Sequence, residues 1–166
     1  MLKKFKKNKN VKIINKNFSF IDHEIKEKVN GIIFDLGVSN YQFTNQKRGF
    51  SYKIDGPLDM RMNQKNKLTA KTIVNTYTKQ QLIEIFKKYG EIKNPQKIVD
   101  EIIKVRKQKT IATTLQLQKI ICDKTKGSIY RKHPAKTYFQ ALRIVVNDEL
   151  NVLKQGLAKA VNLLKK

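Results

Sequence analysis

The sequence predicts an α/β protein in which a small sheet-forming part is joined to a larger helical part. Residues 11–18 and 32–38 are short, rich in β-branched residues and closed by turn formers, a pattern typical of strands. Residues 22–29 lie between them and predict a short helix with Asp22 at its start. A strand, helix and strand in series indicate a parallel sheet, and from residue 78 onward the pattern becomes helical. Two strands are too few for a stable sheet of this kind, which indicates that part of it is missing.

The composition favours a nucleic acid as partner. The chain has 166 residues, 40% of them hydrophobic, enough for one folded domain with a core. Its 36 Lys and Arg against 13 Asp and Glu give a formal net charge of +23, which attracts polyanions. AT-rich coding would also enrich Lys, Asn and Ile, so the charge alone does not identify an RNA site.

Metal, disulfide and membrane roles find little support in the sequence. Cys122 is the single cysteine, so no intramolecular disulfide and no Cys-based zinc site can form. His23 and His133 stand far apart without a ligand-spaced partner, and we expect no metal site. The start MLKKFKKNKN lacks the apolar core of a signal peptide, and no apolar run reaches the length of a membrane span. We therefore expect a cytoplasmic protein in a reducing setting.

Four later segments predict helices from their apolar spacing and end signals. The second of them has Asn94 as its expected N-cap and Pro95 in the first helical position. The last reads either as one long helix or as two in series. The four segments are residues 78–90, 94–109, 113–125 and 133–166.

The basic end of the second helical segment is a candidate RNA contact. Lys104, Arg106 and Lys107 lie in its last turns, where they could face phosphates. Cations in a last helical turn also stabilise the helix dipole. Both interpretations stay open.

A long segment without periodicity, residues 39–67, indicates a functional loop. Arg48 and Arg61 stand near Phe50, and arginines beside exposed aromatic rings can clamp single-stranded bases. The alternative is a packed loop with internal Asp–Arg pairs.

Asp35 ends the second expected strand and is a candidate ligand contact. Open α/β sheets bind ligands in the crevice beyond the carboxyl ends of their strands. Gly37 would allow close backbone approach there, and Gln42 adds a hydrogen-bonding group to the following loop. The alternative for Asp35 is a helix or turn cap.

Several of these segments together resemble the signature blocks of one family, in its order. The blocks are GIIFDLGVS, RGFSYKIDGPLDMRM, NTYTKQQL and HPAKTYFQALRIVVNDEL. They resemble the RsmH (MraW) family of bacterial ribosomal small-subunit RNA methyltransferases, and the resemblance covers nearly all residues from 11 to 166. It implies methyl transfer from S-adenosyl-L-methionine to the exocyclic amine of a cytidine in small-subunit (16S) ribosomal RNA.

The resemblance also implies a fold and its division into domains. The fold would be a partial Rossmann-like, S-adenosylmethionine-dependent methyltransferase domain with an inserted all-helical substrate-binding subdomain. The expected divisions are residues 1–44 for the partial core with two strands and a helix, residues 45–130 for the RNA-binding insertion, and residues 131–166 for the helices that return to the core.

The family's cofactor contacts fall on three residues of matching type, Phe18, Asp35 and Gln42. Asp35 would lie near the entering base, where we hypothesise a catalytic role, since a carboxylate there could accept a hydrogen bond from the cytosine amine. Arg143 matches the helix that returns to the core and is a further expected RNA contact.

Departures from the family pattern leave the activity of the isolated chain open. None of its seven glycines forms the G-x-G of the family's cofactor-binding turn, and Asn40 replaces a usual serine. The resemblance thus implies truncation at both ends. The alternatives are a catalytically inactive basic RNA-binding remnant, or one half of a split enzyme whose complementary chain carries the Gly-rich motif. A homodimer is also left open by the sequence.

Overall fold

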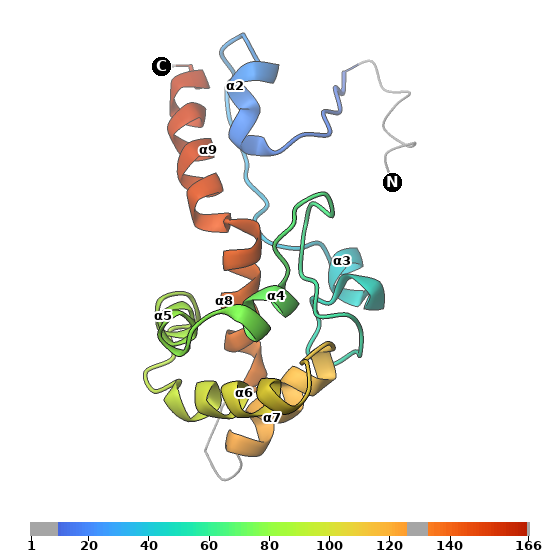
Figure 1. Cartoon of the computed structure of the whole chain (residues 1–166). Coiled ribbons are helices and arrows are strands. Elements are labelled where there is room, and N and C mark those ends of the chain that lie inside the picture. Colours follow the sequence, from blue (N-terminus) through green and yellow to red (C-terminus); the bar gives the residue numbers. More distant parts are fainter. Residues whose placement is uncertain (1–9, 126–132, 166) are drawn as a thin grey trace. The chain divides into compact units, whose positions relative to one another are not determined.

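The computed structural model describes residues 10–125 and 133–165. Their packing divides them into two compact units. The terminal unit joins residues 10–36 to residues 150–165, and the helical unit consists of the described residues between 37 and 149. Figure 1 labels the helices of both units.

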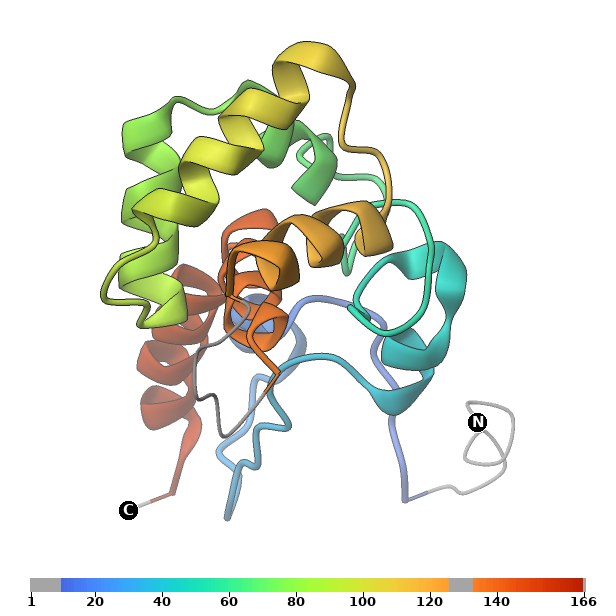
Figure 2. The same cartoon turned by 90° about the horizontal axis from the view of Figure 1, so that it is seen from below.

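The helical unit is built around the pairing of its two central helices, α5 (Lys79–Gly90) and α8 (Ala135–Asn147). Helix α6 (Gln96–Gln108) packs against α5 and against α7 (Thr114–Thr125). Helices α6 and α7 lie side by side in Figure 2. Shorter elements precede them: α3 (Asn40–Thr44), the 3-10 turn η2 (Gln46–Arg48) and α4 (Ala70–Thr76).

The long helices begin and end close to the residues predicted for them. At the start of α5, Thr78 and Gln81 form a capping box, which confirms the helix expected over residues 78–90. Helix α7 likewise lies within the expected segment 113–125. At α6 the N-cap is Pro95 rather than Asn94, so the helix starts one residue later than predicted.

The final helical tract is two helices in series. Asp148 adopts a left-handed conformation with φ of 50° and ends α8, and α9 (Glu149–Leu163) follows. A left-handed residue cannot continue an α-helix, which decides between the two interpretations of residues 133–166.

The core of the helical unit includes the segment that was expected to be a loop. Leu58 and Met60 are 1% and 0% exposed, as deeply buried as helix residues such as Phe86 and Leu142. Phe50, Leu58 and Met60 of this segment therefore pack as part of the core.

The terminal unit packs a short N-terminal turn against α9. The 3-10 turn η1 (Phe18–Phe20) leads into α2 (Ile21–Glu24). The Phe18 ring meets Phe34 edge-on with 5.4 Å between centroids. It also lies over Gly156 of α9, where an added Cβ would be 2.6 Å from Phe18 Cδ2.

The two expected strands do not form. Among the described residues, the only sheet-type pairings are two isolated bridges, Val29 with Leu164 and Pro57 with Thr113. Residues 11–17 and 32–38 have no strand assignment, and the helix expected over residues 22–29 is limited to the single turn α2. A strand needs a neighbour for its N–H and C=O groups, and neither segment has one here. The Rossmann-like fold therefore stays a prediction.

The two units divide after residue 36, and α8 packs within the helical unit, where Tyr138 and Phe139 are buried. The expected domains, residues 1–44, 45–130 and 131–166, stay a prediction. The expected boundary between residues 130 and 131, like residues 1–9, lies outside the described residues. No helix in the described chain is long and apolar enough to cross a membrane.

Candidate functional site

The backbone of the segment DGPLDMRM, residues 55–62, packs closely against the backbone of Arg48 and Gly49. Gly49 has φ of +68°, and a Cβ there would lie 2.0 Å from the carbonyl oxygen of Pro57. The N–H of Met60 donates to the carbonyl of Arg48 over 3.1 Å. Only glycine allows this conformation and this backbone approach at position 49.

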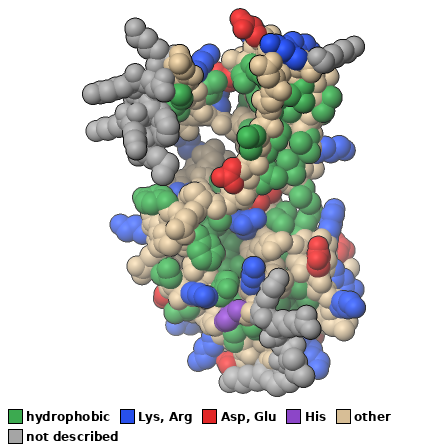
Figure 3. All heavy atoms as spheres, turned by 180° about the vertical axis from the view of Figure 1, so that it is seen from behind, with side chains coloured by type: hydrophobic (Ala, Val, Ile, Leu, Met, Phe, Trp, Pro, Cys, Tyr) green, Lys and Arg blue, Asp and Glu red, His purple; other side chains and the backbone are tan. Residues whose placement is uncertain are grey.

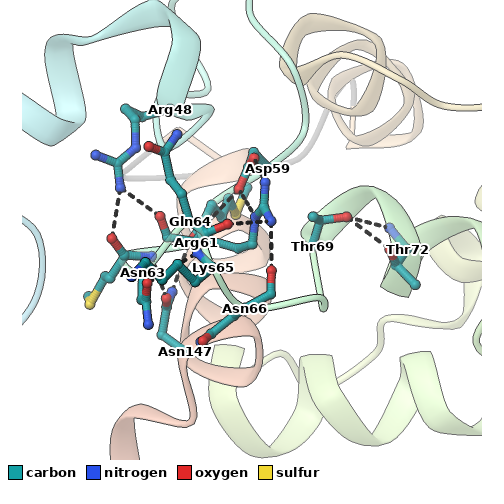
Figure 4. A network of polar contacts seen from close by, with 12 residues as sticks. Arg48, Asp59, Arg61, Asn63, Gln64, Lys65, Asn66, Thr69, Thr72 and Asn147 are labelled. Atoms are coloured by element: carbon teal, nitrogen blue, oxygen red, sulfur yellow. Dashed lines mark hydrogen bonds and ion pairs between the residues drawn. The ribbon is translucent and has the colours of Figure 1, made fainter. Parts of the chain in front are cut away.

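Arg61 is held inside the same segment by Asp59. Its Nε and Nη2 donate to the two carboxylate oxygens over 2.8 and 2.7 Å, and its Nη1 donates to the carbonyls of Gln64 and Asn66 (Figure 4). Burial alone would raise the pKa of Asp59, but the hydrogen bonds and charge of Arg61 outweigh it and hold the pKa below its ordinary value. The internal Asp–Arg pair, the alternative considered for this loop, is present.

Arg48 and Phe50 are also turned inward. Nη2 of Arg48 donates to the carbonyls of Arg61 and Met62 over 2.7 and 3.0 Å, and the guanidinium lies 5.8 Å from the centre of the Phe50 ring. Phe50 is 4% exposed, so the expectation of an exposed ring here is corrected. An apolar ring of this size gains more from burial than from exposure. RNA contact by these residues stays a prediction.

Asn147 of α8 ties the segment to the helix. Its Nδ2 donates to the carbonyl of Met60 over 2.7 Å, and its Oδ1 accepts from the N–H of Met62 over 2.6 Å (Figure 4). One side chain thus satisfies two backbone groups around Met60, which has a φ of 63° that is unfavourable for methionine.

Beside this network, the helical unit contains a pocket of about 300 Å³. Its apolar lining consists of Val38, Phe43, Phe50, Tyr52 and Phe139, and its polar lining consists of Lys136, Gln140 and Arg143. Aromatic walls with a few polar groups suit a planar heterocycle, which stacks on rings and bonds through its edge.

Arg143 is fixed at this pocket by an ion pair. Its Nε and Nη2 donate to the Glu149 carboxylate over 2.7 and 3.1 Å. Nη1 lies 3.7 Å from the position that a Cβ on Gly37 would take, so the backbone at Gly37 runs close to the guanidinium. The paired Arg143 is also part of the pocket lining.

Among the residues that line this pocket, the sequence interpretation missed four: Val38, Phe43, Lys136 and Gln140. Lys136, Gln140 and Arg143 follow each other at three- and four-residue spacing, a signal that places them on one face of α8. Phe43 carried no such signal. Tyr52 stacks on His133 with 4.6 Å between centroids and meets Phe139 edge-on.

The three expected cofactor contacts lie in different units. Phe18 and Asp35 belong to the terminal unit, and Gln42 belongs to the helical unit. Asp35 is exposed, and its carboxylate has no hydrogen-bond or ion-pair partner within the part of the chain that the structure describes. It therefore caps no described helix or turn. Gln42 instead forms the capping box of α3 with Ser39.

The three basic residues expected at the end of α6 divide into two kinds. Arg106 donates to the carbonyls of Val74 and Tyr77 over 3.0 and 2.7 Å, and burial lowers its pKa. Lys104 and Lys107 are exposed. On the face drawn in Figure 3, Lys and Arg side chains are scattered among hydrophobic and neutral ones. On this face, charge by itself therefore does not mark one RNA-binding patch.

No other catalytic arrangement stands out in the described residues. Cys122 Sγ lies 3.9 Å from His133 Nε2, but burial and the charge of Asp123 raise the pKa of the thiol, which disfavours the thiolate. No group of three His, Cys, Asp or Glu side chains could hold a metal ion in these residues.

Comparisons with known proteins agree over almost the whole chain. A sequence model of the MraW methylase family matches residues 1–166. A protein named ribosomal RNA small subunit methyltransferase H from Malacoplasma penetrans is 50% identical over 168 residues, which cover 98% of this chain and 54% of that protein. Proteins of the same name from Halothermothrix orenii and Ureaplasma urealyticum are each 47% identical, over 98% and 96% of this chain and 54% of each relative. The chain thus spans about half the length of these relatives.

Proposed function

This chain belongs to the MraW methylase family, and from that premise we propose that it is part of an S-adenosylmethionine-dependent methyltransferase acting on a cytidine of small-subunit (16S) ribosomal RNA. The observation that carries the proposal is the 50% identity, over 98% of this chain, to a protein named for small-subunit ribosomal RNA methylation. The whole enzyme would adopt the Rossmann-like fold, of which this chain supplies a part together with the helical insertion.

Phe18, Asp35 and Gln42 would hold the cofactor, which supplies an activated methyl group when bound. The free carboxylate of Asp35 fits this role, because a bound amine or hydroxyl would give it the partner that it lacks in the described residues. Phe18 supports the segment that carries Asp35, since its ring packs edge-on against Phe34.

The 300 Å³ pocket in the helical unit is the proposed receptor for the target base or a neighbouring one. Its aromatic rings would stack on the base, and Lys136, Gln140 and Arg143 would bond to its edge or to the adjoining phosphate. The exposed Lys104 and Lys107 are proposed to contact phosphates elsewhere along the RNA. Arg48, Phe50 and Arg61, which are turned inward, would shape the pocket wall and its support.

Asp35 is proposed to act on the cytosine amine. By accepting a hydrogen bond from one N–H of the exocyclic amine, its carboxylate would turn the nitrogen lone pair toward the methyl group. As the N–C bond formed and the bond between the methyl group and its donor broke, the carboxylate would take up the proton that the methylated nitrogen loses. Orientation of this kind, in a site from which water is excluded, is the main contribution that the chain itself would make to the rate.

A chimera tests this proposal. The chain replaces the matching half of the Malacoplasma penetrans relative, and transfer of tritiated methyl groups to small-subunit ribosomal RNA is measured. We expect transfer by the chimera and none by the isolated chain. Asp35→Asn in the chimera should lower the rate about 100-fold, the usual scale for a positioned proton acceptor.

The matched control is Asp100→Asn, which alters an exposed carboxylate that pairs with Lys79. It should leave the rate within about twofold, as expected for an exposed ion pair away from the chemistry. A folded chimera that transfers no methyl group would reject the proposal.

A non-catalytic RNA-binding role is the second candidate, and the net charge of +23 favours it. Under this role the isolated chain would bind small-subunit RNA, and the chimera would bind RNA but fail to transfer methyl groups. If the chain is instead one half of a split enzyme, the chimera should transfer methyl groups.

A further inference from the structure

A second hollow of the helical unit has no part in the proposed methyl-transfer site. It measures about 560 Å³ and lies where the ends of four helices meet. Its lining comes from the turn between α5 and α6, the first turns of α6 and α8, and the end of α7. The polar side chains that matter below are Lys93, Asn94, Lys97, Lys124, His133 and Thr137.

The lining is cationic. Three lysines against one glutamate, Glu91, leave a formal charge of 3 − 1 = +2 with His133 neutral. Lys124 forms an ion pair with Glu101, with 2.8 Å between Nζ and Oε2. Lys93 and Lys97 have no ion-pair partner within residues 10–125 and 133–165. Two uncompensated ammonium groups therefore face the same hollow.

The ends of the helices add to this field. Helices α6 and α8 both start here after a proline, Pro95 and Pro134, and neither proline offers a side-chain cap. Their first turns carry the positive end of the helix dipole. His133 Nδ1 accepts from the N–H of Ala135 over 3.3 Å and so satisfies one of these donors. At the end of α5, the N–H of Glu91 donates to the Phe86 carbonyl, which reduces the opposing negative field.

We propose that this hollow binds a backbone phosphate of RNA, with Lys93 and Lys97 as its main contacts. The ligand must be anionic and strongly hydrated, since two ammonium groups and amide and hydroxyl groups line the site. Lys104 lies seven residues after Lys97 on the same face of α6, about 10 Å further along the axis. Successive phosphates of an RNA strand could contact both Lys97 and Lys104, whereas a single free anion could not reach both.

This inference rests on the proposed function for the identity of the anion. RNA backbone and free inorganic phosphate share the chemistry recognised here. The first predicts that the site adds to the affinity for an oligonucleotide, and the second predicts saturation by phosphate itself.

The test measures the salt dependence of RNA binding by the full chain. A fluorescein-labelled uridine 12-mer is titrated by anisotropy between 50 and 200 mM KCl. Each phosphate neutralised on a single strand contributes about 0.7 to the slope of log K against log salt. Lys93→Gln/Lys97→Gln should therefore lower the magnitude of the slope by about 0.7, the contribution of the one phosphate that the hollow would hold.

The control Lys67→Gln/Lys71→Gln removes the same charge from exposed positions elsewhere in the unit. It should change the slope by less than half as much. Circular dichroism checks that both variants keep their helix content, and inorganic phosphate replaces part of the KCl at constant ionic strength in a parallel titration.

Four outcomes decide the matter. A larger slope change for the Lys93/Lys97 pair, unaffected by phosphate, supports the inference. Equal changes for the two pairs overturn it, as does a wild-type chain that does not bind the 12-mer. If the two variant pairs differ in KCl but no longer differ when inorganic phosphate replaces part of the KCl, the hollow binds a free anion, and the inference is again overturned. None of these depends on methyl transfer, so a failed chimera would reject the proposed activity without altering this result.

Discussion

The helical and terminal units differ in how far each covers its own apolar side chains. In the helical unit Phe86 and Leu142 are fully buried, and even the irregular segment around Met60 belongs to the core. In the terminal unit Ile33 is 97% exposed and Val161 is 70% exposed. A helix satisfies its own backbone and can form a core with a few neighbours, whereas extended segments need partner strands. The main hydrophobic core of the described residues therefore lies in the helical unit.

The same contrast appears along α9. Its buried residues are Gly156, Ala160 and Leu163, and Gly156 lies against the Phe18 ring. Leu150, Leu157 and Val161 are 51%, 46% and 70% exposed and follow each other at helical spacing. The helix thus has an apolar stripe outside the contacts that the described residues make.

The largest expected effect comes from the core of the helical unit. Phe86→Ala removes a ring that is 0% exposed and meets Tyr138 edge-on at 4.8 Å. It should lower the free energy of unfolding by about 3–5 kcal/mol. Phe20→Ala, at a ring that is 51% exposed in the terminal unit, is the matched control and should cost less than about 1 kcal/mol. Urea denaturation followed by circular dichroism gives both values, and similar losses would remove the contrast between the units.

A second comparison uses two glycines. Gly49→Ala places a Cβ 2.0 Å from the Pro57 carbonyl in a left-handed conformation, whereas Gly31→Ala meets no atom within 4 Å. We expect Gly49→Ala to cost about 3 kcal/mol through clash and strain. Gly31→Ala should shift stability by less than about 1 kcal/mol. A tolerated Gly49→Ala would show that the segment around Pro57 is loosely held.

The helices of the helical unit were predictable because their signals are local. Thr78 is the N-cap of α5, Gln81 lies in its first turn and Gly90 is its last residue, so these signals lie at the ends of the helix that they delimit. The same spacing at Ser39 and Gln42 caps α3, which the interpretation of residues 39–67 as a loop overlooked. Strand formation depends on partners elsewhere in the chain, so residues 11–18 and 32–38 could be proposed as strands but not placed.

The candidate site was predictable only in part, for a related reason. Asp35 carries a signal in the sequence because an acid follows an apolar run. The aromatic wall of the pocket in the helical unit has no such signal, because Phe43, Tyr52 and Phe139 meet only after residues nearly a hundred positions apart have folded together. The inward orientation of Arg61 depends equally on its contact with Asp59.

A smaller effect, dependent on pH, is expected at Asp59. Its folded pKa lies below the unfolded value near 3.9, so the Asp59–Arg61 pair stabilises the fold above about pH 4 and this stabilisation is lost as the pH falls through the folded pKa. Asp59→Asn should cost about 1.5 kcal/mol at pH 6. The variant should also lose less stability than the wild type between about pH 5 and 3.

Asp100→Asn serves as the control for this pH series. Its carboxylate is 55% exposed and pairs with a lysine that is also 55% exposed. We expect a change below about 0.5 kcal/mol at either pH. If Asp59→Asn and Asp100→Asn gave the same pH profile, the inward ion pair would not be contributing to the stability of the helical unit.

The smallest expected effect lies on the exposed stripe of α9. Leu157→Ser/Val161→Ser removes two side chains that are 46% and 70% exposed, so little buried area is lost. The free energy of unfolding should change by less than about 1 kcal/mol for the pair, mostly through helix propensity. Because exposed apolar stripes promote association, the variant should also scatter less light than the wild type at high protein concentration. A large loss of stability would instead mean that these side chains are covered in solution, and the contrast between the two units would then be smaller than their exposed areas indicate.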